Sequence, residues 1–190
     1  MKNRITDEKL IKQFQNGDRQ SYNELVFRYK DKILNFLYRF VYDMDLAQDL
    51  AQETFLKVYL KKDSYREISK FSTWMYTIAS NLAKTELRKI KRRKTYAVSE
   101  LSDADRENNY FIQDDSNDKL DDNESKILHE SIYELEQDFR TIIILREIQE
   151  LSYENISKIL KLPLGTVKSR INRGKLKLRE ILINKGVKRI

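Results

Sequence analysis

Apolar residues recur every three or four positions along most of the 190-residue chain, as they do in helices with one buried face. The clearest stripe predicts a helix from Ser21 to Tyr42 and comprises Tyr22, Leu25, Val26, Tyr29, Ile33, Phe36, Leu37 and Phe40. Three further helices are predicted in the first half of the chain, at about residues 7–15, 45–61 and 71–94. The fold is therefore expected to be all-α.

The C-terminal part carries two short helical patterns separated by a sharp break. Ser152 is a suitable N-cap for the first, whose apolar face holds Ile156, Ile159 and Leu160. The segment Lys161–Gly165, with the only proline, ends it. In the second helix, expected from about Thr166, the inner residues are Val167, Ile171, Gly174, Leu178 and Ile181, and the outer ones are Lys168, Ser169, Asn172, Arg173 and Leu176. This arrangement predicts a helix-turn-helix.

The outer residues of the second helix have the chemistry of base recognition in a major groove. Arg173 could bind guanine, Lys168 guanine or phosphate, Asn172 adenine, and Ser169 either a base edge or the backbone. Between Thr166 and Ile190 nine Lys or Arg stand against one acid. That count also fits an ordinary helix with a solvated basic face, and the preceding capped helix and turn favour the helix-turn-helix.

The helix predicted at 45–61 has a second, exposed stripe beside its apolar one. Asp49, Gln52, Glu53 and Leu56, at i, i+3, i+4 and i+7, combine two carboxylates, an amide and a leucine. Such a face suits the docking of another helix. Acid-base catalysis or metal binding would need a further acid or histidine that the pattern does not supply, and a merely solvated face remains an open alternative.

The helix predicted at 71–94 ends in a dense run of cations. Its dipole explains only a small part of this run, whereas phosphates would explain it. With Trp74 and Asn81 nearer its start and Arg88, Lys91 and Arg92 near its end, this helix fits single-stranded or melted DNA.

Charge divides the chain into two basic bodies joined by an acidic strip. The net charge is +9 over residues 1–99, −8 over residues 100–124 and +6 over residues 125–190. The strip has few apolar residues and no sustained period, so burial cannot offset the entropy of ordering it. We therefore expect two small helical domains, residues 1–94 and 125–190, joined by a flexible acidic linker at residues 95–124. The linker could be a solubilising tether or a mimic of nucleic acid.

Composition excludes several classes of site. The chain has no cysteine and one histidine, His129, which we expect to be structural or at the surface, so disulfides and a nitrogen-ligand zinc site are not expected. No apolar run approaches the roughly 20 residues of a membrane span, and the N-terminus lacks the core of a signal peptide. A cytoplasmic protein without cofactor, small-molecule substrate or membrane insertion is expected.

Three ordered motifs carry a resemblance to a known family. They are DLAQDLAQETFLKVY at 45–59, FSTWMYTIASNLAKTELRKIKRR at 71–93 and LSYENISKILKLPLGTVKSRINRGK at 151–175. Together they resemble an extracytoplasmic-function sigma factor, the smallest architecture of the sigma-seventy family. The resemblance implies a promoter-specificity subunit of bacterial RNA polymerase. A stand-alone helix-turn-helix regulator that binds duplex operators is the alternative, and an enzyme is the least supported class.

The resemblance also implies roles for particular residues and partners. Asp49, Gln52 and Glu53, with Leu56 beside them, would dock on a coiled coil of the polymerase's largest subunit. The loop Lys62–Ser72 would capture a flipped base of the minus-ten element. The other implied DNA contacts are Asn81 at that base, Trp74 in the supporting helix, Arg88, Lys91 and Arg92 at phosphates, and Lys168, Ser169, Asn172 and Arg173 at the minus-thirty-five element. Further implied partners are the second-largest catalytic subunit and an anti-sigma factor, which could hold the protein at the membrane. The linker would thread toward the RNA exit channel.

Of the positions that depart from the family pattern, two bear on the helix-turn-helix. Relatives often have Gly before the Leu-Ser-Tyr motif and Ala after the recognition arginine, where this chain has Glu150 and Gly174. Neither change is expected to remove a DNA contact. Gly174 is expected to loosen the second helix by up to about 1 kcal/mol, since glycine is a poor helix former.

Overall fold

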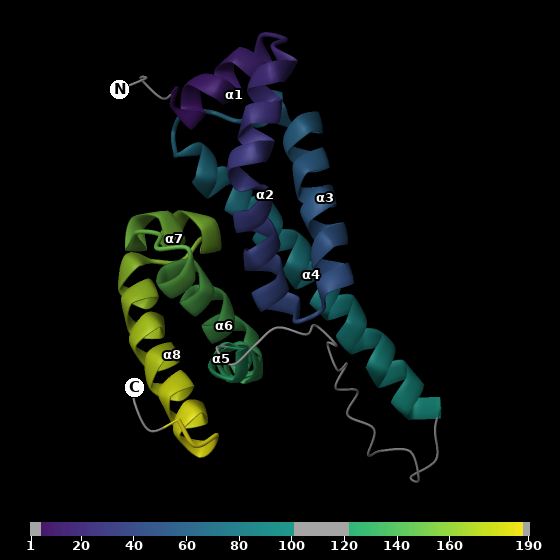
Figure 1. Cartoon of the computed structure of the whole chain (residues 1–190), viewed down its shortest axis with the longest axis vertical. Helices are drawn as coiled ribbons and strands as arrows, with labels where there is room; N and C mark the ends of the chain where they lie inside the picture. The colour runs from purple at the N-terminus through teal and green to yellow at the C-terminus, as the bar shows by residue number, and fades with distance from the viewer. Residues whose placement is uncertain (1–4, 101–121, 188–190) are drawn as a thin grey trace.

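The computed structural model describes residues 5–100 and 122–187, and every regular element within these ranges is a helix (Figure 1). The prediction of an all-α fold is confirmed. The N-terminal half consists of α1 (Asp7–Gln15), α2 (Arg19–Val41), α3 (Met44–Leu60), the 3-10 turn η1 (Lys62–Ser64) and α4 (Phe71–Glu100). The C-terminal half consists of α5 (Asp122–Glu134), α6 (Gln137–Ile143), the π-helical segment η3 (Ile144–Ile148), α7 (Tyr153–Leu160) and α8 (Leu164–Asn184).

Side-chain caps set where the first three helices begin. Thr6, Asp18 and Asp43 accept hydrogen bonds from the backbone amides of Lys9, Gln20 and Leu46 respectively. The caps explain why α2 and α3 begin one or two residues before the sequence pattern indicated. Capping depends on a short polar residue just outside the apolar stripe, so periodicity alone misses it.

The N-terminal half packs α1, α3 and α4 around the long helix α2 (Figure 1). Its core is aromatic at the centre, with Phe14, Phe36, Phe40 and Phe71 fully buried. Along α3, the small residues Ala47, Ala51 and Thr54 are buried together with Leu50 and Val58, and the small side chains favour a close approach to α2 and α4. The opposite face of α3 is thereby left at the surface.

The helix-turn-helix is formed by α7 and α8. The Ser152 hydroxyl accepts from the amide of Asn155, which confirms the predicted cap, and Lys161 ends α7 in the left-handed conformation at φ 54°. α8 begins at Leu164, directly after Pro163, so Gly165 lies inside the helix and not in the turn as the sequence suggested. A proline just before a helix supplies a fixed φ and needs no amide partner, so the turn is shorter than predicted.

Gly174 has a packing role that propensity did not reveal. It is buried where α8 crosses α6, and a Cβ added there would lie 2.9 Å from Ile143 Cγ1. The expectation that this glycine only loosens α8 is therefore revised, because the missing side chain allows the two helices to approach.

Glu150 occupies a backbone conformation that suits glycine. Its φ is 52°, and it follows η3, where the amides of Gln149 and Leu151 reach back to the carbonyls of Ile144 and Leu145. Glu150 therefore places a side chain on a backbone conformation that L-residues disfavour, at the position where the family resemblance implied glycine.

The two halves share one continuous core and lie side by side (Figure 1). α4 contacts α7, and α2 contacts both α5 and η3. The helix α4 continues to Glu100, past the predicted boundary at residue 94, and α5 begins at Asp122. The rest of the acidic strip predicted as a linker lies outside the described residues.

Candidate nucleic-acid interface

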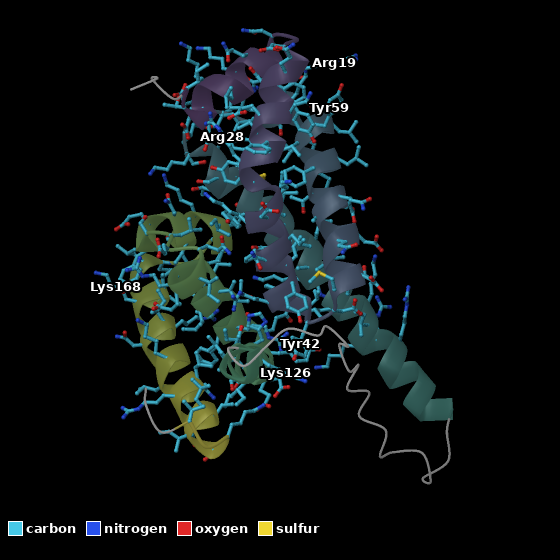
Figure 2. The ribbon with its side chains drawn as sticks, viewed as in Figure 1. Arg19, Arg28, Tyr42, Tyr59, Lys126 and Lys168 are labelled. Carbon is cyan, nitrogen blue, oxygen red and sulfur yellow. The ribbon has the colours of Figure 1, made fainter. Side chains whose placement is uncertain are left out.

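The outer residues of α8 lie together on one open face. Lys168, Ser169, Asn172 and Arg173, called here the reading face, are all exposed, and Lys168 projects from the outer side of α8 (Figure 2). The Ser169 hydroxyl donates to the carbonyl of Thr166 at 3.1 Å and accepts from Arg173 Nη2 at 3.4 Å. The serine thus helps to orient the arginine.

Three other cations of α8 form ion pairs within the fold. Arg170 pairs with Asp138 at 2.8 Å, Lys175 with Glu147 at 3.0 Å and Lys177 with Glu136 at 3.0 Å. These three acids come from the segment Glu136–Glu147 and hold α8 in place. Within the described ranges no ion pair involves Lys168 or Arg173, so the two cations of the reading face remain available to an external anion.

The cationic end of α4 is also exposed. Asn81, Arg88, Lys91 and Arg92 all lie at the surface. Lys84 is half-buried, and burial, the largest cause, lowers the pKa of its ammonium, with nearby Arg170 and Arg88 also lowering it and Asp138 opposing. α4 therefore presents a broad strip of positive charge, in contrast to the few selected cations of α8.

Trp74 lies in an aromatic cluster at the start of α4. Its ring is half-buried and packs 5.5 Å from Tyr65 and 6.1 Å from Phe71, measured between ring centroids. Trp74 therefore packs α4 against the loop between α3 and α4. It lies beside that loop and not beside the cations at the other end of the helix.

The loop after α3 is anchored by the end of α1. Gln15 Nε2 donates to the carbonyls of Lys62 and Tyr65 at 2.7 and 3.2 Å, and Lys62 Nζ donates to the carbonyl of Phe14 at 3.0 Å. The Tyr65 hydroxyl donates to the carbonyl of Ser69 at 2.8 Å, and burial raises the pKa of Tyr65 to about 12. The loop is thus fixed at its base.

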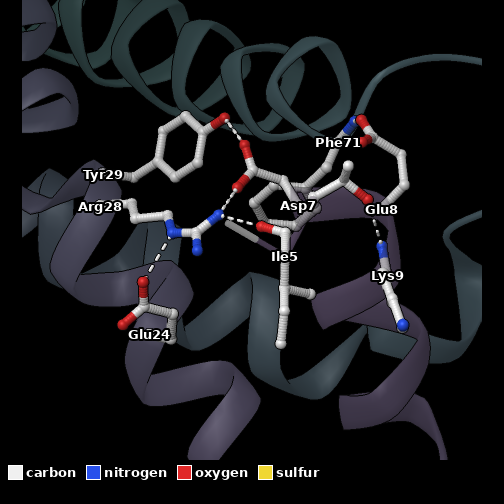
Figure 3. A network of polar contacts seen from close by, with 9 residues as sticks. Ile5, Asp7, Glu8, Lys9, Glu24, Arg28, Tyr29 and Phe71 are labelled. Atoms are coloured by element: carbon white, nitrogen blue, oxygen red, sulfur yellow. Dashed lines mark hydrogen bonds and ion pairs between the residues drawn. The ribbon is translucent and has the colours of Figure 1, made fainter. Parts of the chain in front are cut away.

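A second polar network fixes the start of α4 (Figure 3). Glu8 accepts from the amide of Phe71 at 3.1 Å, and Asp7 accepts from Arg28 at 2.7 Å and from the Tyr29 hydroxyl at 2.5 Å. Burial, the largest cause, and the bond to Asp7 raise the pKa of Tyr29. Glu8 and Gln15 were not predicted as site residues, because their partners are backbone groups that lie dozens of residues away in the sequence.

A polar cleft of about 860 Å³ opens beside these networks. It is bordered by Ile5–Glu8, by Arg28, Tyr29 and Lys32 of α2, by residues 67–70 and Ser72, and by Asn155 and Lys158 of α7. The cleft therefore adjoins the predicted base-capturing loop on one side and the helix-turn-helix on the other.

The second stripe of α3 is exposed, as its pattern predicted. Asp49, Gln52, Glu53 and Leu56, called here the docking face, all lie at the surface, and 55% of Leu56 is accessible. Leu60, one turn further, is 69% accessible and extends the apolar part of this face. Leu60 was not among the predicted residues of this face, although it follows Leu56 at the same i, i+4 spacing.

Family models match both halves. The model described as Sigma-70 region 2 matches residues 25–93, and the one described as Sigma-70, region 4 matches residues 125–178. The RNA polymerase sigma-H factor of Pseudomonas aeruginosa is 38% identical over 89% of this chain and 90% of its own length. The ECF sigma factor SigW of Bacillus subtilis is 37% identical over 92% and 95%, and the ECF sigma-E factor of Escherichia coli 37% over 97% and 96%. The chain is an extracytoplasmic-function sigma factor. It directs promoter recognition and transcription initiation as an alternative sigma factor.

Solved structures share the arrangement of this sigma factor. The sigma factor RpoE of Bartonella quintana, in complex with the anti-sigma factor NepR, matches with a TM-score of 0.71 and 25% identity over 90% of this chain and 99% of that chain. CnrH, solved with the cytosolic domain of CnrY, has the same fold, with a TM-score of 0.71 and 19% identity over 95% and 99%.

The described residues contain neither a membrane-spanning helix nor a cluster of metal ligands. Across residues 5–100 and 122–187, no helix is both long and apolar enough to cross a bilayer. In the same ranges, His, Asp and Glu side chains do not gather in groups of three that could hold a metal ion.

Proposed function

We propose that the docking face of this sigma factor binds a coiled coil of the largest subunit of core RNA polymerase. Its supporting observation is the exposure of Leu56 and Leu60 beside Asp49 and Glu53. An exposed apolar pair flanked by carboxylates suits a partner helix that supplies both an apolar stripe and cations, because the leucines leave water while the acids set orientation.

The cationic strip of α4 and the loop Lys62–Ser72 together hold the melted minus-ten element. Arg88, Lys91 and Arg92 bind phosphates, while the loop and Asn81 take a base that has left the stack. The anchoring of the loop by Gln15 and Glu8 supports this assignment. Taking a base out of the stack costs a few kcal/mol, and a loop that is already held in place can offset this cost with contacts to the base without first being ordered. Trp74 stiffens the junction between loop and helix.

The reading face binds the minus-thirty-five element in the major groove. The observation that carries this assignment is that Lys168 and Arg173 share one exposed face with Ser169 and Asn172 and are free of ion pairs within the described ranges, whereas Arg170, Lys175 and Lys177 are paired within the fold. Arg173 suits a guanine edge, and Asn172 suits adenine. Lys168 and Ser169 fix the helix on the backbone or add base contacts.

The remaining partners are those that the family resemblance implies. The second-largest catalytic subunit completes the polymerase contact, and the linker runs toward the RNA exit channel. The protein works in the cytoplasm without cofactor and without catalysis of its own. An anti-sigma factor, which could be held in the membrane, controls it, a proposal supported by the RpoE structure with NepR, to which the whole arrangement is similar.

In vitro transcription with purified core polymerase over genomic DNA tests the function. We expect transcripts whose aligned start sites share two upstream elements, and no sequence-specific footprint by the sigma factor without polymerase. A palindromic footprint by the free protein would instead establish a stand-alone regulator. Absence of any directed start site, with core polymerase active on a control sigma factor, would overturn the proposal.

A further inference from the structure

The loop between α3 and α4 is held at both ends by one short helix, α1. Near the start of the loop, Gln15 Nε2 donates to the carbonyls of Lys62 and Tyr65 at 2.7 and 3.2 Å. At its end, where α4 begins, Glu8 Oε1 accepts from the amide of Phe71 at 3.1 Å. Two side chains of the same helix therefore hold the two ends of the same loop.

Glu8 and Gln15 lie on one face of α1, because residues at i and i+7 are separated by two helical turns. Their backbone positions are about 10 Å apart along the helix axis. Ile11, which lies between them on this face, is fully buried, so the face is turned toward the rest of the N-terminal half. The helix thus sets a fixed separation between the two ends of the loop.

The start of α1 is itself fixed by α2 (Figure 3). Asp7 accepts from Arg28 Nη1 at 2.7 Å and from the Tyr29 hydroxyl at 2.5 Å. The same Nη1 donates to the carbonyl of Ile5 at 2.8 Å. Only 12% of the Arg28 side chain is accessible, so solvent screens this ion pair less than an exposed one. Glu8, which follows Asp7 in the chain, therefore projects from an anchored helix start.

The end of α1 is fixed by contacts that run in the opposite direction. Lys62 Nζ donates to the carbonyl of Phe14 at 3.0 Å and lies 4.6 Å from the centroid of the Phe14 ring. A cation at this position also interacts favourably with the C-terminal end of the helix dipole. The Phe14 ring packs against Tyr22 and Tyr59, with centroids 4.8 and 5.2 Å away. Gln15 therefore projects from a firmly packed helix end.

Between the two anchors, the tip of the loop is exposed. Arg66, Glu67 and Ile68 all lie at the surface, and 84% of Ile68 is accessible. The amide of Ile68 donates to the carbonyl of Arg66 at 2.7 Å, which makes a tight turn. The Tyr65 hydroxyl donates to the carbonyl of Ser69 at 2.8 Å and joins the two sides of the tip. The tip is thus a short exposed turn whose two sides are held by α1.

The position of this tip decides how sharply it distinguishes one base from another. A base outside the stack is recognised through hydrogen bonds to its edge, and these bonds hold only within narrow ranges of distance and angle. A tip that moved freely would first have to be ordered, which lowers the affinity for every base, and it would adapt to several of them. A tip held at both ends avoids that cost and keeps one arrangement.

From these contacts we infer that α1 sets the base selectivity of the sigma factor at the minus-ten element, with Gln15 and Glu8 as positioning residues that hold the loop Lys62–Ser72 in the arrangement that fits one base. This inference rests on the proposed function, because it deepens the role of that loop in base capture. Both residues lie outside residues 25–93, the range that the Sigma-70 region 2 model matches. In this assignment neither residue touches DNA, and each acts through the backbone of the loop.

An isosteric exchange at position 15 tests the inference. Gln15→Glu keeps the shape of the side chain but removes the amide group that donates to the carbonyls of Lys62 and Tyr65. Holoenzyme binding to single-stranded oligonucleotides that carry each of the four bases at each minus-ten position measures selectivity. At the captured position we expect the ratio of affinities for the preferred and the other bases to fall about tenfold, with the affinity for core polymerase unchanged.

Gln13→Glu is the matched control, since it makes the same exchange in the same helix. Gln13 Oε1 accepts from the Ser21 hydroxyl at 3.0 Å, and a glutamate oxygen still accepts there. This variant should retain base selectivity. Equal loss in both variants, or full selectivity of Gln15→Glu, would overturn the inference while base capture stood. An unaltered holoenzyme without base preference in the minus-ten element would instead overturn base capture, and the inference with it.

Glu8 offers a second test with a conservative rescue. Glu8→Ala and Glu8→Gln both remove the carboxylate charge, but the glutamine oxygen can still accept from the amide of Phe71. We expect Glu8→Ala to lower base selectivity about fivefold and Glu8→Gln to retain it, in the same oligonucleotide assay. Equal selectivity of these two variants would contradict the positioning role of Glu8.

Amide hydrogen exchange in the free protein reports the order of the loop without polymerase or DNA. The amides of Ser64, Tyr65 and Ile68 are hydrogen-bonded within the loop, and each should exchange faster in Gln15→Glu than in Gln13→Glu. Such a difference supports positioning by α1 independently of base capture. Equal exchange in the two variants would show that the loop is ordered without Gln15 and would overturn the inference, whatever the oligonucleotide assay gave.

Discussion

The docking face and the reading face are both exposed helix surfaces, yet they offer opposite chemistry. The docking face on α3 combines Asp49 and Glu53 with an accessible leucine at position 56, whereas the reading face on α8 combines two cations with an amide and a hydroxyl. Burial of apolar area in a protein interface favours binding because that area leaves water. Cations favour binding to DNA because they displace counterions from the phosphates. The contrast underlies our proposal that the docking face meets protein and the reading face meets DNA.

The two faces are also held in different ways. α3 lies on its neighbours through small buried residues such as Ala47 and Ala51, so its position depends on close packing. α8 is held by Gly174 against α6 and by ion pairs such as Arg170–Asp138. Exposed ion pairs weaken as salt rises, whereas close packing does not. The position of the reading face should therefore depend more on ionic strength than the position of the docking face does.

Reversing charge on the docking face should have the largest effect. Asp49→Lys with Glu53→Lys should reduce affinity for core polymerase at least about a hundredfold, because like charges facing across an interface cost several kcal/mol. Titration of labelled protein with core polymerase measures the loss. Asp31→Lys with Glu180→Lys changes the net charge equally at exposed sites elsewhere and should retain binding. Unchanged affinity in the first variant would move the docking site to another surface.

Removing Arg173 should have the next largest effect and should be sequence-specific. Arg173→Ala should lose about 1–3 kcal/mol of discrimination at the base it contacts, as expected for a two-pronged arginine–guanine pair. Start-site selection by the holoenzyme on promoters randomised in the minus-thirty-five element measures it. Lys177→Ala removes a cation of α8 that pairs with Glu136 and should leave base preference intact. Equal relaxation in both variants would show that charge alone matters.

Much of the fold follows from local sequence signals. The stripe of α2, the cap at Ser152 and the exposed face of α3 each depend on residues within a few turns, so periodicity and capping chemistry predict them. The site residues were predicted from a pattern or from the family resemblance, and the structure places each face at the surface. Their roles remain predictions.

The residues that the sequence patterns did not predict act through contacts between distant segments of the chain. Gln15 and Glu8 look like ordinary polar residues of a short helix, and only the fold brings them to the backbone of the loop and of Phe71. The hydrogen bond from the Tyr76 hydroxyl to Gln149 Oε1 joins residues that are 73 positions apart. No local rule reports such pairs, because they depend on how helices pack and not on how each helix forms.

Adding a methyl group at Gly174 tests how α8 is held. Gly174→Ala should destabilise the protein by about 1–3 kcal/mol, since its Cβ would overlap Ile143 and force the helices apart. Gly165→Ala, in the same helix with open space around it, should stabilise by about 0.5–1 kcal/mol. Urea unfolding followed by circular dichroism measures both. Ile143→Ala, which removes both overlapping atoms, should cost less stability in the Gly174→Ala background than in the unaltered chain, and equal stability of the Gly174→Ala and Gly165→Ala variants would contradict the close approach.

Glycine at position 150 should give the smallest effect, and it concerns the segment that leads into the helix-turn-helix. Glu150→Gly should stabilise the protein by about 0.5 kcal/mol, because relief of the left-handed conformation exceeds the extra entropy that glycine loses on folding. The expected rise in melting temperature is about 1–2 °C. Glu180→Gly, at an exposed position inside α8, should instead lower stability by up to about 1 kcal/mol. If both variants lost stability, the contacts of the Glu150 side chain would contribute more to stability than its left-handed backbone conformation costs, and those contacts would help to position α8.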